Sequence, residues 1–131
     1  MGMESKFIWM NGEMVPFEKA TLHFLTPALH YGAAVFEGIR AYDTPKGPAV
    51  FRLTDHIERL FDSARVFGFR EFPWSVEQIV DATKQVTVTH YTFRRQNNAP
   101  AAQVGSASFS WAQGATNIAT VPSRRWTISS A

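Results

Sequence analysis

The chain has 131 residues, of which 45% are hydrophobic and 18% charged, a composition suited to one globular domain with a core. It contains no cysteine, which excludes disulfides, zinc–thiolate sites and thiol nucleophiles. No apolar run approaches the ~18–20 residues of a membrane span and no signal-peptide pattern opens the chain, so we expect a cytoplasmic protein without a membrane partner.

The net charge of +2 conceals an uneven distribution along the chain. Residues 1–90 hold nine lysines and arginines against eleven acidic residues, whereas residues 91–131 hold four arginines and no acidic residue. A basic tail can indicate binding to nucleic acid or to an anionic surface. These arginines form two isolated pairs with few aromatic residues between them, so we expect no nucleic-acid partner.

The first predicted elements are a β-hairpin and a short helix. The hairpin covers residues 7–15, where two apolar runs flank Asn11-Gly12, a dipeptide that accommodates the positive φ angles of a type I′ turn. One helical turn follows over residues 26–31, with Thr26 as its predicted N-cap and Gly32 ending it.

The most informative segment is residues 30–42, with the sequence HYGAAVFEGIRAY. Its alternation predicts a strand over residues 35–42, with Phe36 and Arg40 on one face around the bare backbone of Gly38. An apolar ring, a fixed cation and an uncovered amide suit a small ligand with an apolar part and an anionic part. The alternative is a half-buried strand in which Gly38 is a bulge and Arg40 a surface charge.

Two amphipathic helices are predicted after a hairpin turn at residues 43–48. The first begins at its N-cap Thr54 and ends at Gly68, and its apolar positions recur at steps of three and four. That stripe consists of Ile57, Leu60, Phe61, Ala64 and Phe67. Ser75 and Gln78 are spaced as a capping box for the second helix. Its inner face consists of Ile79, Ala82, Thr83 and Val86.

Together these elements predict an α+β fold, a small antiparallel sheet with helices on one face. The regular pattern stops near His90. Residues 91–131 are rich in Ser, Ala, Thr, Gln and Asn and show no assignable periodicity. We expect them to be irregular, because no apolar face offsets the entropy of ordering the chain. The prediction is therefore a folded domain over residues 1–90 and an irregular tail over residues 91–131.

Five blocks of sequence carry a resemblance to a known family. They are IWMNGEMV (8–15), ALHYG (28–32), VFEGIRAY (35–42), GPAVFR (47–52) and HIERLFDSA (56–64). In this order and spacing they resemble the small amino-terminal domain of the branched-chain amino-acid aminotransferases, the pyridoxal-phosphate (PLP) enzymes of fold type IV. The resemblance runs from Ile8 to about His90, roughly two-thirds of the chain.

The resemblance implies PLP-dependent amino transfer from leucine, isoleucine or valine to 2-oxoglutarate, in enzymes that form homodimers. The family's aldimine lysine lies in a second domain, so this chain is expected to be an amino-terminal fragment that is inactive alone. It has only four lysines, and none lies in a family-like context, so no catalytic residue is assigned. They are Lys6, Lys19, Lys46 and Lys84. The alternatives are another fold type IV enzyme, such as a D-amino-acid transaminase or an aminodeoxychorismate lyase, or a non-catalytic interaction module.

The resemblance assigns Arg59, in the pattern His-x-x-Arg-Leu, to the PLP phosphate. A guanidinium gives a planar fork of donors that fits phosphate oxygens and stays charged. The alternative is an ion pair with Asp55 on a solvated helix face. Glu37 is not assigned to the pyridine nitrogen, because the family places that carboxylate in its second domain. The histidines lack metal-ligand spacing, so no metal site is predicted.

The resemblance assigns Tyr31, Phe36, Gly38 and Arg40 to the substrate side-chain pocket, formed partly by the neighbouring subunit. Phe36 and Tyr31 are expected to form apolar walls for leucine, isoleucine or valine. Arg40, with the tyrosine hydroxyl, is expected to accept the distal carboxylate of glutamate.

One hypothesis accounts for the different character of the tail, namely that it is a reading-frame product of a longer gene. If the codons of residues 105–112 are read two nucleotides out of phase, degenerate third positions permit Ile-Arg-Leu-Val-Phe-Leu-Gly. That sequence is close to a strand that the family carries at this point. An independently cloned gene with the same frame and stop would refute the hypothesis.

Overall fold

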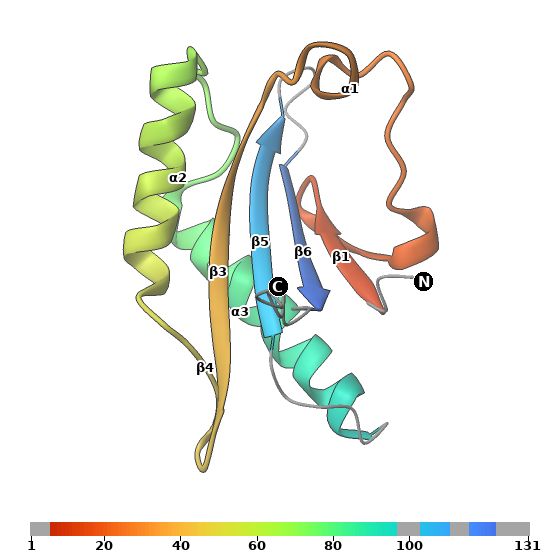
Figure 1. Cartoon of the computed structure of the whole chain (residues 1–131), viewed down its shortest axis with the longest axis vertical. Coiled ribbons are helices and arrows are strands. Elements are labelled where there is room, and N and C mark those ends of the chain that lie inside the picture. The colour runs from red at the N-terminus through yellow and green to blue at the C-terminus, as the bar shows by residue number, and fades with distance from the viewer. Residues whose placement is uncertain (1–5, 97–102, 111–115, 123–131) are drawn as a thin grey trace, which may run out of the picture.

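The computed structural model describes residues 6–96, 103–110 and 116–122 (Figure 1). Among these residues six strands form one antiparallel sheet, and helices α2 (Leu53–Phe67) and α3 (Val76–Gln96) cover one of its faces. The short helix α1 (Pro27–Tyr31) lies at the end of the sheet where β3 begins. This is the predicted α+β architecture. In the described part of the chain, no helix is both long and apolar enough to span a membrane.

The sheet has the strand order β2-β1-β6-β5-β3-β4. Its strands are β1 (Phe7–Met10), β2 (Glu13–Pro16), β3 (Ala34–Thr44), β4 (Gly47–Val50), β5 (Gln103–Ser110) and β6 (Thr116–Pro122), and a 3₁₀ turn η1 (Phe17–Lys19) follows β2. The first hairpin is the predicted one, with Ile8 opposite Val15. Asn11 and Gly12 both have positive φ, 51° and 99°, as a type I′ turn requires.

The structure differs from the expectation of an irregular tail. Helix α3 continues to Gln96, and strands β5 and β6 occupy the centre of the sheet between β1 and β3. Their ladder partners are strands formed by the first fifty residues, so backbone pairing orders them without an amphipathic pattern of their own. Residues 97–102, 111–115 and 123–131 of the expected tail lie outside the described residues. The division at residue 90 and the reading-frame hypothesis stay predictions.

Helix α1 is preceded by Thr26, the predicted N-cap. The Thr26 hydroxyl, however, donates to the carbonyl of His23 (2.6 Å) and makes no capping bond. His30 Nε2 lies 2.9 Å from the carbonyl oxygen of Phe24, which ties the helix to the loop before it. Gly32, at φ 62°, ends the helix as predicted and turns the chain into β3.

Helix α2 starts two residues earlier than predicted, at Leu53 rather than Asp55. Its N-cap is Arg52, at φ 46°, and the His56 N–H already donates to the Arg52 carbonyl (3.1 Å), so Thr54 lies inside the first turn. The prediction of Phe67 in the buried stripe is also wrong. Phe67 is half exposed and stacks on Phe69, with ring centroids 5.6 Å apart, because the helix ends there and the core no longer lies beneath it.

The rest of both predicted stripes is buried and forms the core between the helices and the sheet. The buried stripe residues are Ile57, Leu60, Phe61 and Ala64 of α2 and Ile79, Ala82, Thr83 and Val86 of α3. The predicted capping box is present, since the Gln78 N–H donates to Ser75 Oγ (3.2 Å) and the Ser75 N–H donates to Gln78 Oε1 (2.8 Å). These contacts hold α2 against β3, and α3 against α2, β1 and β6.

Gly12→Ala is expected to destabilise the chain more than Gly47→Ala. Both glycines have positive φ, 99° and 109°, so both substitutions strain the backbone. A Cβ at Gly12 would lie 2.5 Å from Cη2 of Trp74, whereas nothing lies within 4 Å of a Cβ at Gly47. Overpacking costs about 1–3 kcal/mol, and we expect this extra loss of unfolding free energy for Gly12→Ala in urea titrations. Equal losses for the two variants would contradict the packing of Trp74 on this turn.

Candidate functional site

Strand β3 presents different side chains on its two faces. Glu37 is only 8% exposed and Ile39 is buried, and both face the helices, whereas Phe36 is 77% exposed on the opposite face. Phe36, Gly38 and Arg40 therefore share the open face, as the alternation predicted. The alternative of a bulge at Gly38 is wrong, because β3 pairs with β5 in unbroken register through this position.

Tyr31 lies at the end of α1 and is 85% exposed. The loop and helix leading to it also expose large apolar side chains. These are Leu22, Phe24, Leu25 and Leu29. Exposed apolar groups on this scale mark a surface that another molecule or segment covers.

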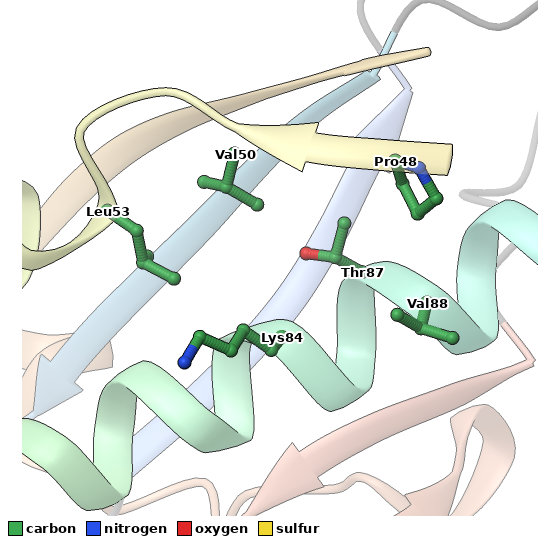
Figure 2. A pocket seen from close by; sticks show the side chains of 6 residues that line it. All are labelled: Pro48, Val50, Leu53, Lys84, Thr87 and Val88. Carbon is green, nitrogen blue, oxygen red and sulfur yellow. The ribbon is translucent and has the colours of Figure 1, made fainter. Parts of the chain in front are cut away.

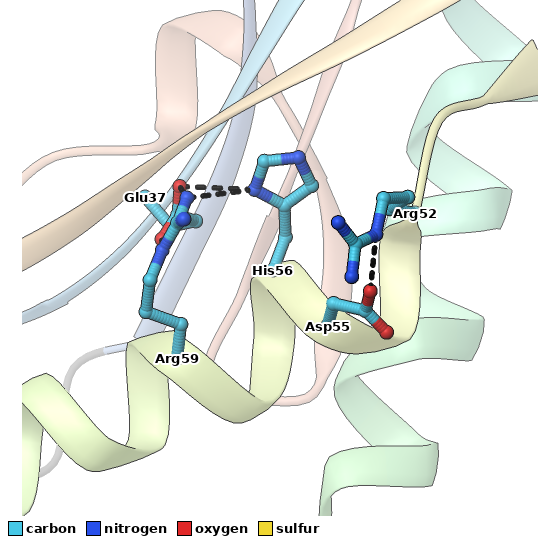
Figure 3. Close-up of polar contacts among 5 residues, drawn as sticks. All are labelled: Glu37, Arg52, Asp55, His56 and Arg59. Carbon is cyan, nitrogen blue, oxygen red and sulfur yellow. Dashed lines mark hydrogen bonds and ion pairs between the residues drawn. The ribbon is translucent and has the colours of Figure 1, made fainter.

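A compact ionic cluster lies on the other face of β3, where Glu37 meets two side chains of α2 (Figure 3). Arg59 Nε donates to Glu37 Oε2 (2.7 Å) and Arg59 Nη2 donates to Glu37 Oε1 (2.5 Å). His56 Nδ1 lies 3.0 Å from the same Oε1. His56 and Arg59 are three positions apart, so one face of the helix brings both to the carboxylate. The carboxylate thus binds the guanidinium in the bidentate manner typical of strong Arg–carboxylate pairs.

The electrostatics of this cluster keep Glu37 ionised. Hydrogen bonds from Arg59 hold the pKa of Glu37 below its ordinary value, with His56 assisting and burial opposing. His56 Nδ1 lies near two groups of opposite character, since the ionised carboxylate only accepts hydrogen bonds and Arg59 Nη2, 3.1 Å away, only donates, so the tautomer of His56 decides which of the two it bonds. Because the folded pKa is below the unfolded one, the contribution of Glu37 to stability is present above the unfolded pKa. That contribution is lost as pH falls through the folded value.

Arg59 does not form the alternative ion pair with Asp55, which instead bonds the guanidinium of Arg52. The Arg59 side chain is 63% exposed, and its Nη1 has no hydrogen-bond partner among the described residues. One edge of the guanidinium is therefore anchored on Glu37 while the other can receive an anion. This arrangement fits a phosphate group, and the assignment of Arg59 to the cofactor phosphate stays a prediction.

The absence of a PLP-binding lysine stays a prediction, and two of the described lysines make contacts away from the predicted site. Lys84 lies 3.2 Å from Asp81 on the exposed side of α3, and Lys6 lies over the ring of Phe7 at 5.7 Å from its centroid. No lysine contacts the cluster of Glu37, His56 and Arg59 within residues 6–96. The described residues also hold no group of three or more His, Asp or Glu that could bind a metal.

The predicted pocket residues Phe36, Gly38 and Arg40 and the predicted phosphate-binding residue Arg59 lie on opposite faces of β3. Strand β4 pairs with β3 from Ala41 to Thr44, so the earlier part of this edge has no strand partner in the described part of the chain. The Phe51 N–H donates to the carbonyl of Arg40 (3.2 Å), which shows that residue 40 directs its backbone toward this edge. By alternation the N–H and C=O groups of Phe36 and Gly38 face the same edge. These backbone groups are therefore available to a further strand or a ligand at this edge.

A cavity of about 300 Å³ lies apart from the predicted site residues (Figure 2). It opens between β4, the start of α2 and α3, and its lining consists of Pro48, Val50, Leu53, Lys84, Thr87 and Val88. The lining is mostly aliphatic and includes none of the residues that the sequence assigned to the site. The sequence predicts a solvated surface position for Lys84, and its ion pair with Asp81 agrees with that interpretation.

Sequence reasoning missed the contacts of Glu37 and His56 with Arg59. A signal was available, because Glu37 lies on the core-facing side of a predicted strand, where an unpaired carboxylate is unfavourable. His56 and Arg59 flank two positions of the apolar stripe, Ile57 and Leu60. A helix packed on the strand by that stripe brings both side chains close to the carboxylate.

Curated proteins with similar sequences are branched-chain-amino-acid aminotransferases, although no protein-family model matches the chain. The enzyme of Pseudomonas aeruginosa is 44% identical over 107 residues, which cover 82% of this chain and 32% of that protein. The enzyme of Escherichia coli K12 is 43% identical over 101 residues, covering 77% and 30%. A probable enzyme of this name from Rickettsia typhi is 37% identical over 122 residues, covering 90% and 40%. The chain thus spans about a third of the length of these relatives.

Solved structures of the same enzymes share the fold. The Escherichia coli branched-chain amino acid aminotransferase matches with a TM-score of 0.77 at 33% identity, covering 94% of this chain and 41% of that one. The T.th. enzyme, complexed with N-(5′-phosphopyridoxyl)-L-glutamate, matches with a TM-score of 0.76 at 34% identity, covering 92% and 42%. A match over 94% of the chain extends beyond residue 90, into the segment where strands β5 and β6 lie.

Proposed function

Because this chain belongs to the branched-chain aminotransferase family and spans about a third of the length of its curated relatives, we propose that it supplies the substrate pocket and the phosphate anchor for PLP-dependent transamination. The reaction transfers an amino group between leucine, isoleucine or valine and 2-oxoglutarate. The proposal is supported by one observation, namely that the two faces of β3 carry different parts of the predicted site. Its open face carries Phe36, Gly38 and Arg40, and its other face anchors Arg59 beside the open edge.

The open face of β3 has the chemistry to sort two kinds of substrate side chain. The exposed rings of Phe36 and Tyr31 offer apolar contact to a branched aliphatic chain. Gly38 adds no side chain next to Phe36 on this face, and a Cβ there would meet nothing within 4 Å. Arg40 offers a fixed cation to the distal carboxylate of glutamate, and the Tyr31 hydroxyl can donate to the same group.

PLP, when bound, supplies the electron sink that transamination needs. The part of this chain is to hold the phosphate through Arg59 and to shape the space beside it. A nucleophilic lysine needs a desolvated or cationic environment, and the exposed, ion-paired Lys84 does not have one. We therefore expect the reactive lysine to come from sequence corresponding to the remaining length of the relatives. The same sequence, or a second subunit, would cover the exposed apolar groups around Tyr31 and Phe36.

Complementation tests this proposal. The 131-residue chain is mixed with a separately expressed part of the Pseudomonas aeruginosa relative that follows its matched 107 residues. Amino transfer from leucine to 2-oxoglutarate is measured in the mixture and with each part alone. We expect activity in the mixture only, because the chain provides the phosphate anchor and pocket while its complement provides the lysine.

The matched control replaces the chain with the corresponding 107-residue segment of the relative. If that segment restores activity and the 131-residue chain does not, the proposed function is wrong. Size-exclusion chromatography of the same mixtures shows whether an inactive mixture nevertheless contains a complex, as the alternative of a non-catalytic interaction module requires.

A further inference from the structure

The cluster of Glu37, His56 and Arg59 has a feature that a structural ion pair does not need. Its acidic member is buried and held from two sides, while its basic member remains mostly exposed, with one nitrogen unused among the described residues. An ordinary surface ion pair, such as that of Asp62 with Arg65 on the same helix, exposes both partners. The asymmetry suits a guanidinium that is fixed for contact with something outside the fold.

We propose that Glu37, braced by His56, is a positioning residue that orients Arg59 for binding a phosphate group. The inference rests on the proposed function and adds a role for two residues that it leaves unassigned. Arginine loses considerable side-chain freedom when it binds a ligand, and this lowers affinity. Two hydrogen bonds from Arg59 to Glu37 fix the guanidinium plane before the ligand arrives, so less freedom remains to be lost.

Glu37 is not itself placed to contact a ligand. One of its oxygens accepts from Arg59 Nε, and the other accepts from Arg59 Nη2 and lies beside His56 Nδ1. The residue is also almost completely buried. A role as partner of the cofactor's ring nitrogen would require breaking these bonds, whereas a role behind Arg59 uses them as they are.

Glu37 has two opposite effects on phosphate binding by Arg59. It orients the guanidinium, which favours binding, and its negative charge repels the anion, which disfavours binding. The carboxylate lies behind the guanidinium, away from the unused Nη1, where its repulsion of an approaching anion is weakest. Glu37→Gln removes the charge but turns an N–H₂ group toward an arginine that has only donors. If orientation dominates, this variant binds phosphate more weakly, and if charge dominates, it binds more tightly.

The experiment compares the full chain with Glu37→Gln, Arg59→Gln and the control Asp62→Asn. Calorimetric titration with pyridoxamine 5′-phosphate, and with pyridoxamine as the phosphate-free control, gives the affinities. We expect the affinity for the phosphorylated compound to fall about tenfold for Glu37→Gln and at least as much for Arg59→Gln. Asp62→Asn should bind like the original chain. The affinity for pyridoxamine should not change in any variant.

A second measurement reports orientation directly. The Nε–H signal of Arg59 in ¹⁵N-resolved NMR should be protected from solvent exchange in the original chain and lose protection in Glu37→Gln. If Glu37→Gln does not fold, His56→Ala should show a smaller change in the same direction in both measurements.

The outcomes separate the two proposals. Equal or tighter phosphate binding by Glu37→Gln, with Arg59→Gln weakened, overturns the positioning role and leaves Arg59 as the anchor. Unchanged binding by Arg59→Gln, or no phosphate-dependent binding by the original chain, overturns both.

Discussion

Leu60→Ala is expected to lower the free energy of unfolding by about 2–5 kcal/mol, a large part of the ~5–15 kcal/mol that stabilises a typical domain. Leu60 lies in the middle of α2 and is 0% exposed, between the sheet and α3. Its truncation leaves a cavity that the surrounding helices and strands can fill only in part. Urea titration followed by circular dichroism measures the loss.

Val66→Ala is the matched control on the same helix, because Val66 is 91% exposed. We expect its effect to stay within about 0.5 kcal/mol. Similar losses for Leu60→Ala and Val66→Ala would mean that α2 does not pack on β3 as described. The same comparison bears on the candidate site, since α2 carries both His56 and Arg59 to Glu37. A loosened α2 is therefore expected to weaken phosphate binding as well.

Phe36→Ala and Arg40→Met are expected to alter the selectivity of the complemented enzyme in opposite ways. Loss of an apolar ring against the substrate side chain removes about 1.5–3 kcal/mol, so kcat/KM for leucine should fall about 10- to 100-fold in Phe36→Ala. Loss of a charged hydrogen-bond donor removes a similar amount for glutamate. Arg40→Met should therefore reduce kcat/KM for glutamate about 10- to 100-fold and leave that for leucine nearly unchanged.

The control for both variants is Arg70→Met, an exposed cation in the loop between α2 and α3. Its removal should change neither rate. If Phe36→Ala and Arg40→Met reduce the rates for leucine and glutamate by the same factor, the open face of β3 does not sort substrate side chains. That result would contradict the assignment of Tyr31, Phe36, Gly38 and Arg40 to the pocket. It would not contradict the fold.

Local patterns in the sequence predicted the elements whose stability is local. The Asn11-Gly12 turn, the capping box at Ser75 and Gln78 and the alternation along β3 all depend on residues a few positions apart, and each is present. Ends of elements were less predictable. Phe67 has the right spacing for burial but lies where α2 runs past the core.

The central strands β5 and β6 were beyond the reach of local patterns. Gln103–Ser110 and Thr116–Pro122 contain many small and polar residues, and periodicity does not mark them as strands. They are ordered by backbone bonds to β3 and β1, whose paired residues lie 62 to 109 positions away in sequence, as Ala41 with Gln103 and Trp9 with Ile118 show. Pairing of that kind depends on which edges the rest of the fold leaves open.

Residue types and spacing were sufficient to place Phe36, Gly38 and Arg40 on one face of a strand. The assignment of Arg59 to a phosphate came from the family resemblance and stays a prediction. The partner of Arg59 was decided by packing alone. Glu37 and Arg59 are 22 positions apart, and they meet only because the buried stripe of α2 lays that helix on β3. Periodicity indicates which face of a helix or strand is apolar. Whether two polar side chains beside those faces meet depends on the position and angle at which the helix packs on the sheet.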